Sequence, residues 1–330
     1  MELNERSQAL LERLADGEFH AVEQLSQDFT LSNSDIALAI AQLTKAGVPV
    51  ESVSNQGYRI PHGIQRLRKA AIENQLKTSI KEKLDDIIIL AQTTSTNDYL
   101  LDLAKKEHTK NIACFAEYQS AARGRHGRPW LAPYGTNVYF SLLWHFKKTP
   151  TEIVSISLAV ALAVVMTLEH HGIQKGLSVK WPNDVYWAGR KIAGVLLEMT
   201  SNPKEGCSVV IGIGLNTHIP PELGQTINQP WTDIHTITKQ NPDRNRLAGL
   251  LLNHLIETIG VFNEQSLTPF LPMWRELDHL IGKTVKLESQ GHEIMGVMQD
   301  ISEKGELILL CDNNQEKRFY SGELSLRMVK

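Results

Sequence analysis

The 330-residue sequence predicts a mixed α/β (α+β) protein built of three successive parts. Three observations support this prediction. Short amphipathic helical stretches fill the first part, and apolar strand-like runs alternate with helices in the second. The third part contains only short strand-like runs separated by Gly, Asp and Asn. We place these parts at residues 1–62, 84–277 and 278–330, joined by a polar connector at 63–83 that contains one helix.

The composition is that of a soluble globular protein, with 42% hydrophobic residues, 22% charged residues and a net charge of −3. Cys114, Cys207 and Cys311 lie far apart and form no C-x-x-C, which argues against a disulfide framework or a zinc site. The N-terminus is polar, and the most apolar span, 153–168, is too short for a membrane helix and predicts a buried core helix. We therefore expect a cytoplasmic protein with no membrane segment and no metal cluster.

The first part predicts three helices. The first has leucines on one face and is ended by Gly17, the second covers 21–29, and the third is capped by Ser32 or Ser34 and ended by Gly47. Two strand runs follow and flank a short polar turn that contains a glycine, which predicts a hairpin. Three helices followed by a hairpin is the order of a winged helix-turn-helix domain, whose usual function is to bind DNA.

The charge of this first part is unfavourable for DNA binding. Residues 1–62 contain four basic and nine acidic residues, whereas Lys and Arg supply most of the non-specific affinity for DNA. Asp35 in the third helix would repel phosphate, although Asn and Gln can read adenine. A helical docking domain that no longer binds DNA therefore stays open as the alternative. The candidate DNA contacts are Ser32, Asn33, Ser34, Gln42 and Arg59.

The second part alternates strands with helices, as an α/β domain does. A hydroxyl-rich run at 93–97 precedes its first helix, where it can cap the helix or hold the polar head of a ligand. The expected strands lie at 87–90, 112–118, 137–144, 180–185, 189–198 and 209–215, and the expected helices at 98–106, 149–171, 243–262 and 266–277. The third part predicts a small SH3-like antiparallel barrel with strands at 284–288, 293–299, 307–311, 317–320 and 324–329.

The stretch QSAARGRHGRPW at 119–130 predicts a loop that closes over an anion. Two glycines and a proline within seven residues disfavour a helix, and the proline disfavours a central strand. Glycine lets backbone N–H groups approach a ligand, and each of the three arginines offers a planar fork to phosphate or carboxylate. A solvated basic turn or a nucleic-acid contact is the alternative for such a stretch taken alone.

Two further motifs place charge in the same domain. KWPNDV at 180–185 presents an amide and the carboxylate of Asp184, and GRKIAGVLLE at 189–198 places Lys191 directly before an apolar strand. Singly, Asp184 is a turn residue and Lys191 a surface cation. Together with the arginine loop they supply an anion clamp, a cation at the reacting centre and a carboxylate, which is the equipment of acyl-adenylate chemistry. No Walker A motif is present, and Thr217 breaks the G-x-G-x-x-G pattern of a dinucleotide site.

The motifs QSAARGRHGRPW, KWPNDVYW, GRKIAGVLLEM, IGIGLN and GELSLR, in this order and spacing, resemble those of the biotin–protein ligases. The winged-helix part resembles that of the members that also repress biotin genes. The resemblance covers essentially the whole chain and implies a central biotin/lipoate-ligase-like catalytic domain. It implies that ATP, with Mg²⁺, activates biotin to biotinyl-5′-AMP, and that biotin then passes to a lysine of the biotin carboxyl carrier protein of acetyl-CoA carboxylase.

The resemblance further implies that biotinyl-5′-AMP acts as a corepressor, so that the adenylate-bound ligase binds operator DNA as a homodimer. An exposed sheet edge at 195–199 is the segment that we expect to pair across the two-fold axis. A lipoate–protein ligase, which shares the architecture and the chemistry, is one alternative, and a ligand-sensing repressor that has lost catalysis is another. The arginine loop favours biotin over lipoate.

Carried over position by position, the resemblance implies three sets of site residues. The catalytic residues are Lys191, Arg125, Arg123 and Asp184. The biotin-binding residues are Ser95, Thr96, Asn97, Gln119, Ala122, Arg123, Gly124, Arg125, Lys191 and Gly194. The residues that bind ATP or the adenylate are Arg128, Trp130, Asn183, Asn216, Trp231 and Arg327.

Two positions depart from the family pattern. Ala122 stands where a glycine usually precedes the first loop arginine, and we expect function to be retained if the φ angle of this alanine is negative. His126 stands where the family often has arginine, which weakens the positive charge of the loop.

Overall fold

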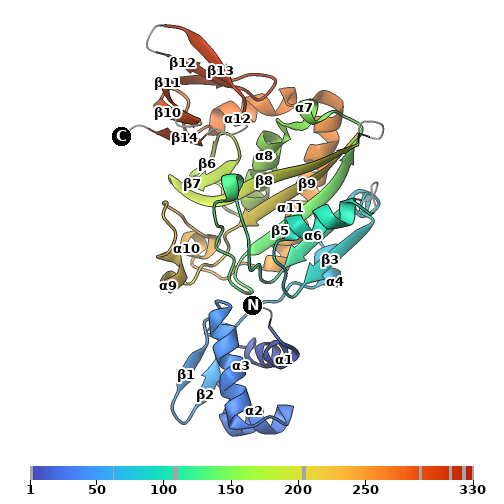
Figure 1. Cartoon of the computed structure of the whole chain (residues 1–330), viewed down its shortest axis with the longest axis vertical. Coiled ribbons are helices and arrows are strands. Elements are labelled where there is room, and N and C mark those ends of the chain that lie inside the picture. The colour runs from blue at the N-terminus through green and yellow to red at the C-terminus, as the bar shows by residue number, and fades with distance from the viewer. Residues whose placement is uncertain are drawn as a thin grey trace.

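The structure is a computed structural model that describes residues 3–61, 63–106, 111–202, 206–289, 292–311, 314–321 and 325–328. The chain forms a central α/β unit, with the N-terminal helices at one end and a C-terminal antiparallel sheet at the other (Figure 1). The mixed α/β class predicted from the sequence is confirmed.

Three helices and a hairpin form the N-terminal part, as predicted. Their apolar faces meet in a core that contains Leu10, Leu25 and Leu43. Tyr134 of the central unit is buried in the same core, so the two parts share packing. The elements are α1 (Glu5–Leu14), α2 (Val22–Phe29), α3 (Asn33–Lys45), β1 (Glu51–Val53) and β2 (Gly57–Arg59).

The connector contains two short helices, α4 (Lys69–Glu73) and α5 (Thr78–Lys81), where the sequence predicted one. Both lie against α11 (Arg244–Gln265). The Asn253 side chain of α11 accepts a hydrogen bond from the Lys77 N–H and donates one to the Gln75 carbonyl. A distant asparagine therefore supplies hydrogen-bond partners for backbone groups of the segment between α4 and α5, and a local pattern could not reveal this partner.

A seven-stranded sheet in the order β3-β4-β5-β9-β8-β7-β6 forms the centre. β3 and β4 run parallel, and the other neighbouring strands run antiparallel. Cys114 of β4 packs with Leu100 of α6 (Thr96–Ala104) on one face, whereas the adjacent Phe115 belongs to the core on the other face. The strands are β3 (Asp86–Leu90), β4 (Ile112–Ala116), β5 (Val138–Phe146), β6 (Leu177–Lys180), β7 (Asp184–Trp187), β8 (Arg190–Asn202) and β9 (Gly206–Leu215).

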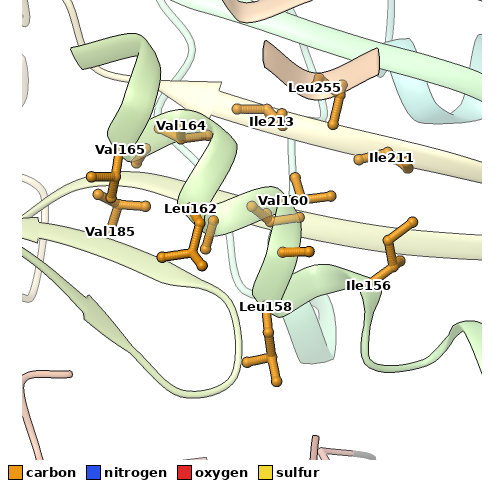
Figure 2. Close-up of a cluster of buried hydrophobic side chains, with 14 of the residues drawn as sticks. Ile156, Leu158, Val160, Leu162, Val164, Val165, Val185, Ile211, Ile213 and Leu255 are labelled. Carbon is orange, nitrogen blue, oxygen red and sulfur yellow. The ribbon is translucent and has the colours of Figure 1, made fainter. Parts of the chain in front are cut away.

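The predicted helix at 149–171 is two helices, α7 (Pro150–Ile153) and α8 (Ile156–His170), separated by a turn at 154–155. Figure 2 shows the apolar side chains of α8 lying among those of β7, β9 and α11. By length and composition alone Pro150–His170 could cross a membrane, but 78% of its most apolar window is buried inside the molecule. The prediction of a buried core helix is confirmed.

The C-terminal part is a five-stranded antiparallel sheet in the order β13-β12-β11-β10-β14, in agreement with the predicted short strands. The Trp181 indole N–H donates to the Gly305 carbonyl across the junction with the central unit. The predicted helix at 266–277 begins as a 3₁₀ turn, η2 (Thr268–Phe270), and continues as α12 (Leu271–Leu277). The strands are β10 (Thr284–Ser289), β11 (His292–Ile301), β12 (Leu307–Leu310), β13 (Glu316–Phe319) and β14 (Ser325–Met328).

A buried ion pair joins the connector to the central sheet. Glu117, which follows β4, and Arg244, the first residue of α11, lie 2.8 Å apart and are both almost fully buried. The other Glu117 carboxylate oxygen accepts from the Leu67 N–H at 2.6 Å, and Arg244 donates to the Gln65 carbonyl at 2.7 Å. Arg244 also donates twice to the Asn137 carbonyl, at 3.0 and 2.7 Å. Both charges are therefore compensated by several hydrogen bonds, as a buried pair requires.

We predict that Glu117→Gln lowers the free energy of unfolding by about 3–5 kcal/mol, because it leaves the Arg244 charge uncompensated in the interior. Urea denaturation measures this loss. Asp102→Asn is the matched control, because the Asp102–Lys105 pair is exposed on both sides, so solvent screens it and its loss should leave the midpoint of unfolding almost unchanged. Equal effects of the two substitutions would contradict the prediction.

Candidate active site

A cavity of about 870 Å³ lies between the start of α6, the arginine loop, the turn between β6 and β7, the first half of β8 and the C-terminal end of β9. It brings together site residues that are more than a hundred positions apart in the sequence. The predicted residues that line it are Ser95, Thr96, Asn97, Gln119, Ala122, Arg123, Gly124, Arg125, Arg128, Trp130, Asn183, Asp184, Lys191, Gly194, Asn216 and Trp231. Arg327 lies on β14, and its side chain falls outside the described part of the chain, although the neighbouring Leu326 lines the cavity.

The polar end of the cavity is a hydrogen-bonded cluster at the start of α6. The Ser95 hydroxyl caps the helix by accepting from the Asn97 N–H. The Gln119 amide oxygen accepts from the Thr96 N–H at 2.7 Å and from its hydroxyl at 3.2 Å. Ser141 of β5 lies 2.6 Å from the Thr96 hydroxyl and donates to the Asn97 amide oxygen. The hydroxyl-rich run therefore caps the helix, which is one of the two roles that the sequence allowed, and its Ser95 and Thr96 also line the cavity.

The sequence analysis missed Ser141, and the available signal was one serine inside a mostly apolar strand. It also missed Gly212, which lies under the same cluster. A Cβ atom on Gly212 would lie 2.3 Å from the Asn97 amide oxygen, so no larger residue fits there without a shift of Asn97. The backbone of β9 thus approaches the polar cluster closely.

The arginine loop has a fixed neck and a projecting tip. Arg123 and Pro129 form an antiparallel bridge, and the Gly124 N–H donates to the Arg128 carbonyl at 2.8 Å. The Trp130 N–H donates to the Ala122 carbonyl at 3.0 Å. His126 (φ 57°) and Gly127 (φ 68°) turn the chain at the tip, within the 3₁₀ turn η1 (Arg125–Gly127). Ala122 is not among the residues with positive φ, so its backbone meets the condition under which its methyl group is accommodated.

The Trp130 indole seats the C-terminal side of this neck on two glycines of the sheet. A Cβ atom on Gly214 would lie 2.6 Å from the indole, and one on Gly194 would lie 3.3 Å from it. The Lys191 ammonium lies 5.3 Å from the centroid of the same ring. The Trp130 indole N–H is buried and has no hydrogen-bond partner among the described residues. The indole therefore lies at the floor of the cavity, beside the predicted catalytic lysine.

Lys191 and Asp184 form an ion pair of 2.7 Å, with both side chains mostly buried. The backbone of Lys191 exchanges hydrogen bonds with Pro230 and Thr232, which brings Trp231 to the same end of the cavity. The Trp231 indole N–H donates to the Gly224 carbonyl at the end of α9 (Pro221–Gly224), and the Asn216 amide donates to the Thr232 carbonyl. The segment between β9 and α11, for which the sequence predicted no element, contains α9 and α10 (Ile234–Thr238) and forms this wall.

Two loop arginines are held by different partners. The Arg125 guanidinium donates to the Ser321 carbonyl of the C-terminal part, and burial lowers its pKa from the ordinary arginine value. Arg123 instead forms two hydrogen bonds with Asp98, at 2.8 and 2.6 Å, and two with Glu198, at 2.9 and 3.1 Å. The hydrogen bonds that Arg123 donates to Asp98, and then those that it donates to Glu198, raise the pKa of Arg123 above the ordinary arginine value. The loop thus contacts α6, β8 and, through Ser321, the C-terminal part.

The candidate DNA contacts lie in the N-terminal part, away from the cavity lining. Ser32 caps α3 in a capping box with Asp35, and Arg6 pairs with Asp35. The amide oxygens of Asn33 and Gln42 accept from Ser26 and Ser7, and Ser34 lies 2.8 Å from Ser32. Arg59 pairs with Glu51 and lies over the Phe19 ring. Their roles in DNA binding stay predictions.

The comparisons with known proteins agree with this geometry. Residues 89–216 match the model of the biotin/lipoate A/B protein ligase family, and residues 280–327 match that of the biotin protein ligase C-terminal domain. The chain is 36% identical over 321 residues to the bifunctional ligase/repressor BirA of Escherichia coli, covering 97% of both chains, and 27% identical to that of Bacillus subtilis, covering 94% and 95%. It also resembles the solved biotin protein ligase of Aquifex aeolicus in complex with biotin and ATP, with 30% identity, a TM-score of 0.63 and coverage of 74% of this chain and 100% of that one.

The fold and the two family models define the class of protein, which is a protein ligase of the biotin/lipoate type. Within this class the full-length similarity identifies the family, because it includes the N-terminal helices and hairpin. The chain belongs to the family of bifunctional biotin ligase/repressors.

We predict that Gly214→Ala weakens biotin binding about 10-fold or more, because the new methyl group would displace Trp130 and with it the neck of the loop. Titration calorimetry measures the effect. Gly260→Ala is the control, because nothing lies within 4 Å of its would-be Cβ and alanine favours the helix α11. Wild-type affinity for biotin in Gly214→Ala would show that the packing of Trp130 on Gly214 is not needed for binding.

Proposed function

We propose that this protein is an ATP-dependent biotin–protein ligase that forms biotinyl-5′-AMP and transfers biotin to a lysine of the biotin carboxyl carrier protein, and that it also represses the genes of biotin synthesis. One observation carries the ligase activity. The arginine loop, the Lys191–Asp184 pair and the polar cluster of α6 meet in a single cavity. The names of the relatives, which include a biotin–[acetyl-CoA-carboxylase] ligase of Mycobacterium tuberculosis at 33% identity, support the same activity.

The chemistry of the first step requires positive charge. A carboxylate and the α-phosphate of a nucleotide repel each other, so the site must stabilise the negative charge that develops between them. We assign this role to Lys191, with Arg125 and Arg128 of the loop. Asp184, 2.7 Å from the Lys191 ammonium, orients that ammonium in the free protein.

The second step requires that the target lysine loses a proton before it attacks the mixed anhydride. Asp184 is our candidate to orient or accept that proton, because it is the one carboxylate among the described residues that line the cavity. The anhydride must also be protected from water. We assign this protection to the loop, whose tip is tied to the C-terminal part through Arg125 and Ser321.

Mg²⁺ fits the site as a companion of the nucleotide. In the described part of the chain, no group of three His, Cys, Asp or Glu residues could hold a metal. Mg²⁺ is usually bound through substrate phosphates with one or two carboxylates, and here Asp184 would supply the carboxylate with Asn183 beside it. When bound, the ion would neutralise charge on the phosphate oxygens.

The proposal extends to the partners and the domain organisation. We assign DNA binding to residues 1–62, ligation to 84–277 and an accessory role at the nucleotide to 278–330, all in the cytoplasm. The edge of β8 supports a homodimer. β7 pairs with β8 only from Arg190 to Gly194, and beyond that point the described pairing of β8 is with β9 alone. A second copy could therefore add its own β8 to this edge.

We predict that Lys191→Ala reduces adenylate formation about 100- to 1000-fold, because the developing charge loses its partner. Biotin-dependent exchange of diphosphate into ATP measures this step. Lys105→Ala, which removes an exposed lysine directly after α6, is the control. Parallel assays with lipoate and a carrier domain separate the two ligase activities, and lipoate turnover in place of biotin turnover would overturn the proposed substrate.

We predict that DNA binding by this protein depends only weakly on salt. Arg6, Arg13 and Arg59 are each paired with an acidic residue of the N-terminal part, so few of them are available to displace counterions from phosphate. A gel shift on the promoter of the biotin genes, with and without biotinyl-5′-AMP over a series of salt concentrations, measures this dependence. A steep loss of affinity with salt would contradict it, and no shift in any condition would leave the ligase without a repressor function.

A further inference from the structure

The arginine loop, on which the proposed function depends, is anchored by a cluster of charged side chains. None of the roles predicted from the sequence explains the two carboxylates of this cluster. Arg123 lies between Asp98 on α6 and Glu198 on β8, and its guanidinium donates to both carboxylates. All three side chains are partly buried, with exposed fractions of 28%, 40% and 27%. The two carboxylates outweigh the one guanidinium, so the cluster as a whole is negative. Arg123 therefore adds no net positive charge for a phosphate or a carboxylate in the cavity.

Glu198 also binds the polar cluster at the other side. One of its carboxylate oxygens accepts from the Asn97 side-chain amide at 2.7 Å. Asn97 in turn accepts from Ser141, which contacts Thr96. A single acidic side chain on β8 thus fixes both the first turn of α6, where the predicted acid-binding residues lie, and the start of the arginine loop.

The neck of the arginine loop links the position of Arg123 to that of the loop tip. Arg123 is one half of the bridge with Pro129, and the tip between them carries Arg125 and Arg128. Trp130 anchors the other half against the sheet. A shift of Arg123 therefore moves the tip as a whole, together with the two arginines that face the cavity.

We propose that Glu198, with Asp98, is a positioning residue for the ligase reaction: it holds Arg123 and thereby keeps the tip of the arginine loop closed over the bound acid and its adenylate. The inference rests on the proposed function. It changes the role assigned to Arg123. In this proposal Arg123 positions the loop, and the other cations of the site stabilise the negative charge of the nucleotide. It predicts a defect in holding ligand, with little defect in the chemical step.

The test compares Glu198→Gln with the wild-type chain in three measurements: KM for biotin, kcat, and the rate at which pre-formed biotinyl-5′-AMP leaves the protein. We expect KM and the release rate each to rise about 10-fold, the size expected when a hydrogen bond to a charged group is lost, with kcat within about 3-fold of wild type. Asp98→Asn acts on the same arginine from another element and should give the same pattern. Release is also visible as indiscriminate biotinylation of bystander lysines.

Matched controls are Asp102→Asn on the same helix and Glu264→Gln at the exposed end of α11. Glu198→Asp, which keeps the charge, should retain biotinyl-5′-AMP better than Glu198→Gln does. If Glu198 were needed only for folding, its substitution would instead lower the melting temperature. Wild-type KM and release rates in both Glu198→Gln and Asp98→Asn would overturn the proposal, and so would a fall in kcat at unchanged KM. Activity of the wild-type chain in the same assay tests the proposed function separately.

Discussion

The ion pair between Glu117 and Arg244 holds together the segments on which the site depends. Glu117 lies two residues before Gln119, whose amide oxygen binds Thr96, so it fixes the end of β4 beside the polar cluster. Arg244 binds the Asn137 carbonyl, and the Asn137 side chain accepts from the N–H groups of Thr217 and His218, directly after Asn216. The acid side and the nucleotide side of the cavity are therefore positioned from one buried node. The same node binds the connector at Gln65 and Leu67, which leads to the N-terminal helices.

The sequence was informative wherever a function needs an unusual local composition. The glycine-arginine loop, the hydroxyl run before α6, and the positions of Asp184 and Lys191 were all recognisable as short motifs, and all of them line the cavity. The three N-terminal helices and most of the sheet were also predictable, because their apolar residues follow the periods of helix and strand. Short motifs and periodicity are local properties, which is why a single sequence can carry them.

The features that could not be predicted depend on partners far away in the chain. Glu117 and Arg244 look ordinary in the sequence, and only the fold brings them together across 127 positions. Arg123 was predicted as a cation for the ligand, yet its partners Asp98 and Glu198 are 25 and 75 positions away. The two helices of the connector lie against α11, and α9 is joined to Trp231 by a hydrogen bond; no local pattern encodes either of these contacts.

The position of α8 within the chain affects how the protein is made. This helix has no polar face, and its covering strand β9 and helix α11 are translated well after it. While the chain is still on the ribosome, α8 therefore leaves the exit tunnel without the segments that will enclose it. Nascent chains that end after α8 and before α11 carry this apolar helix without α11 to cover it, which is the kind of surface that holdase chaperones bind.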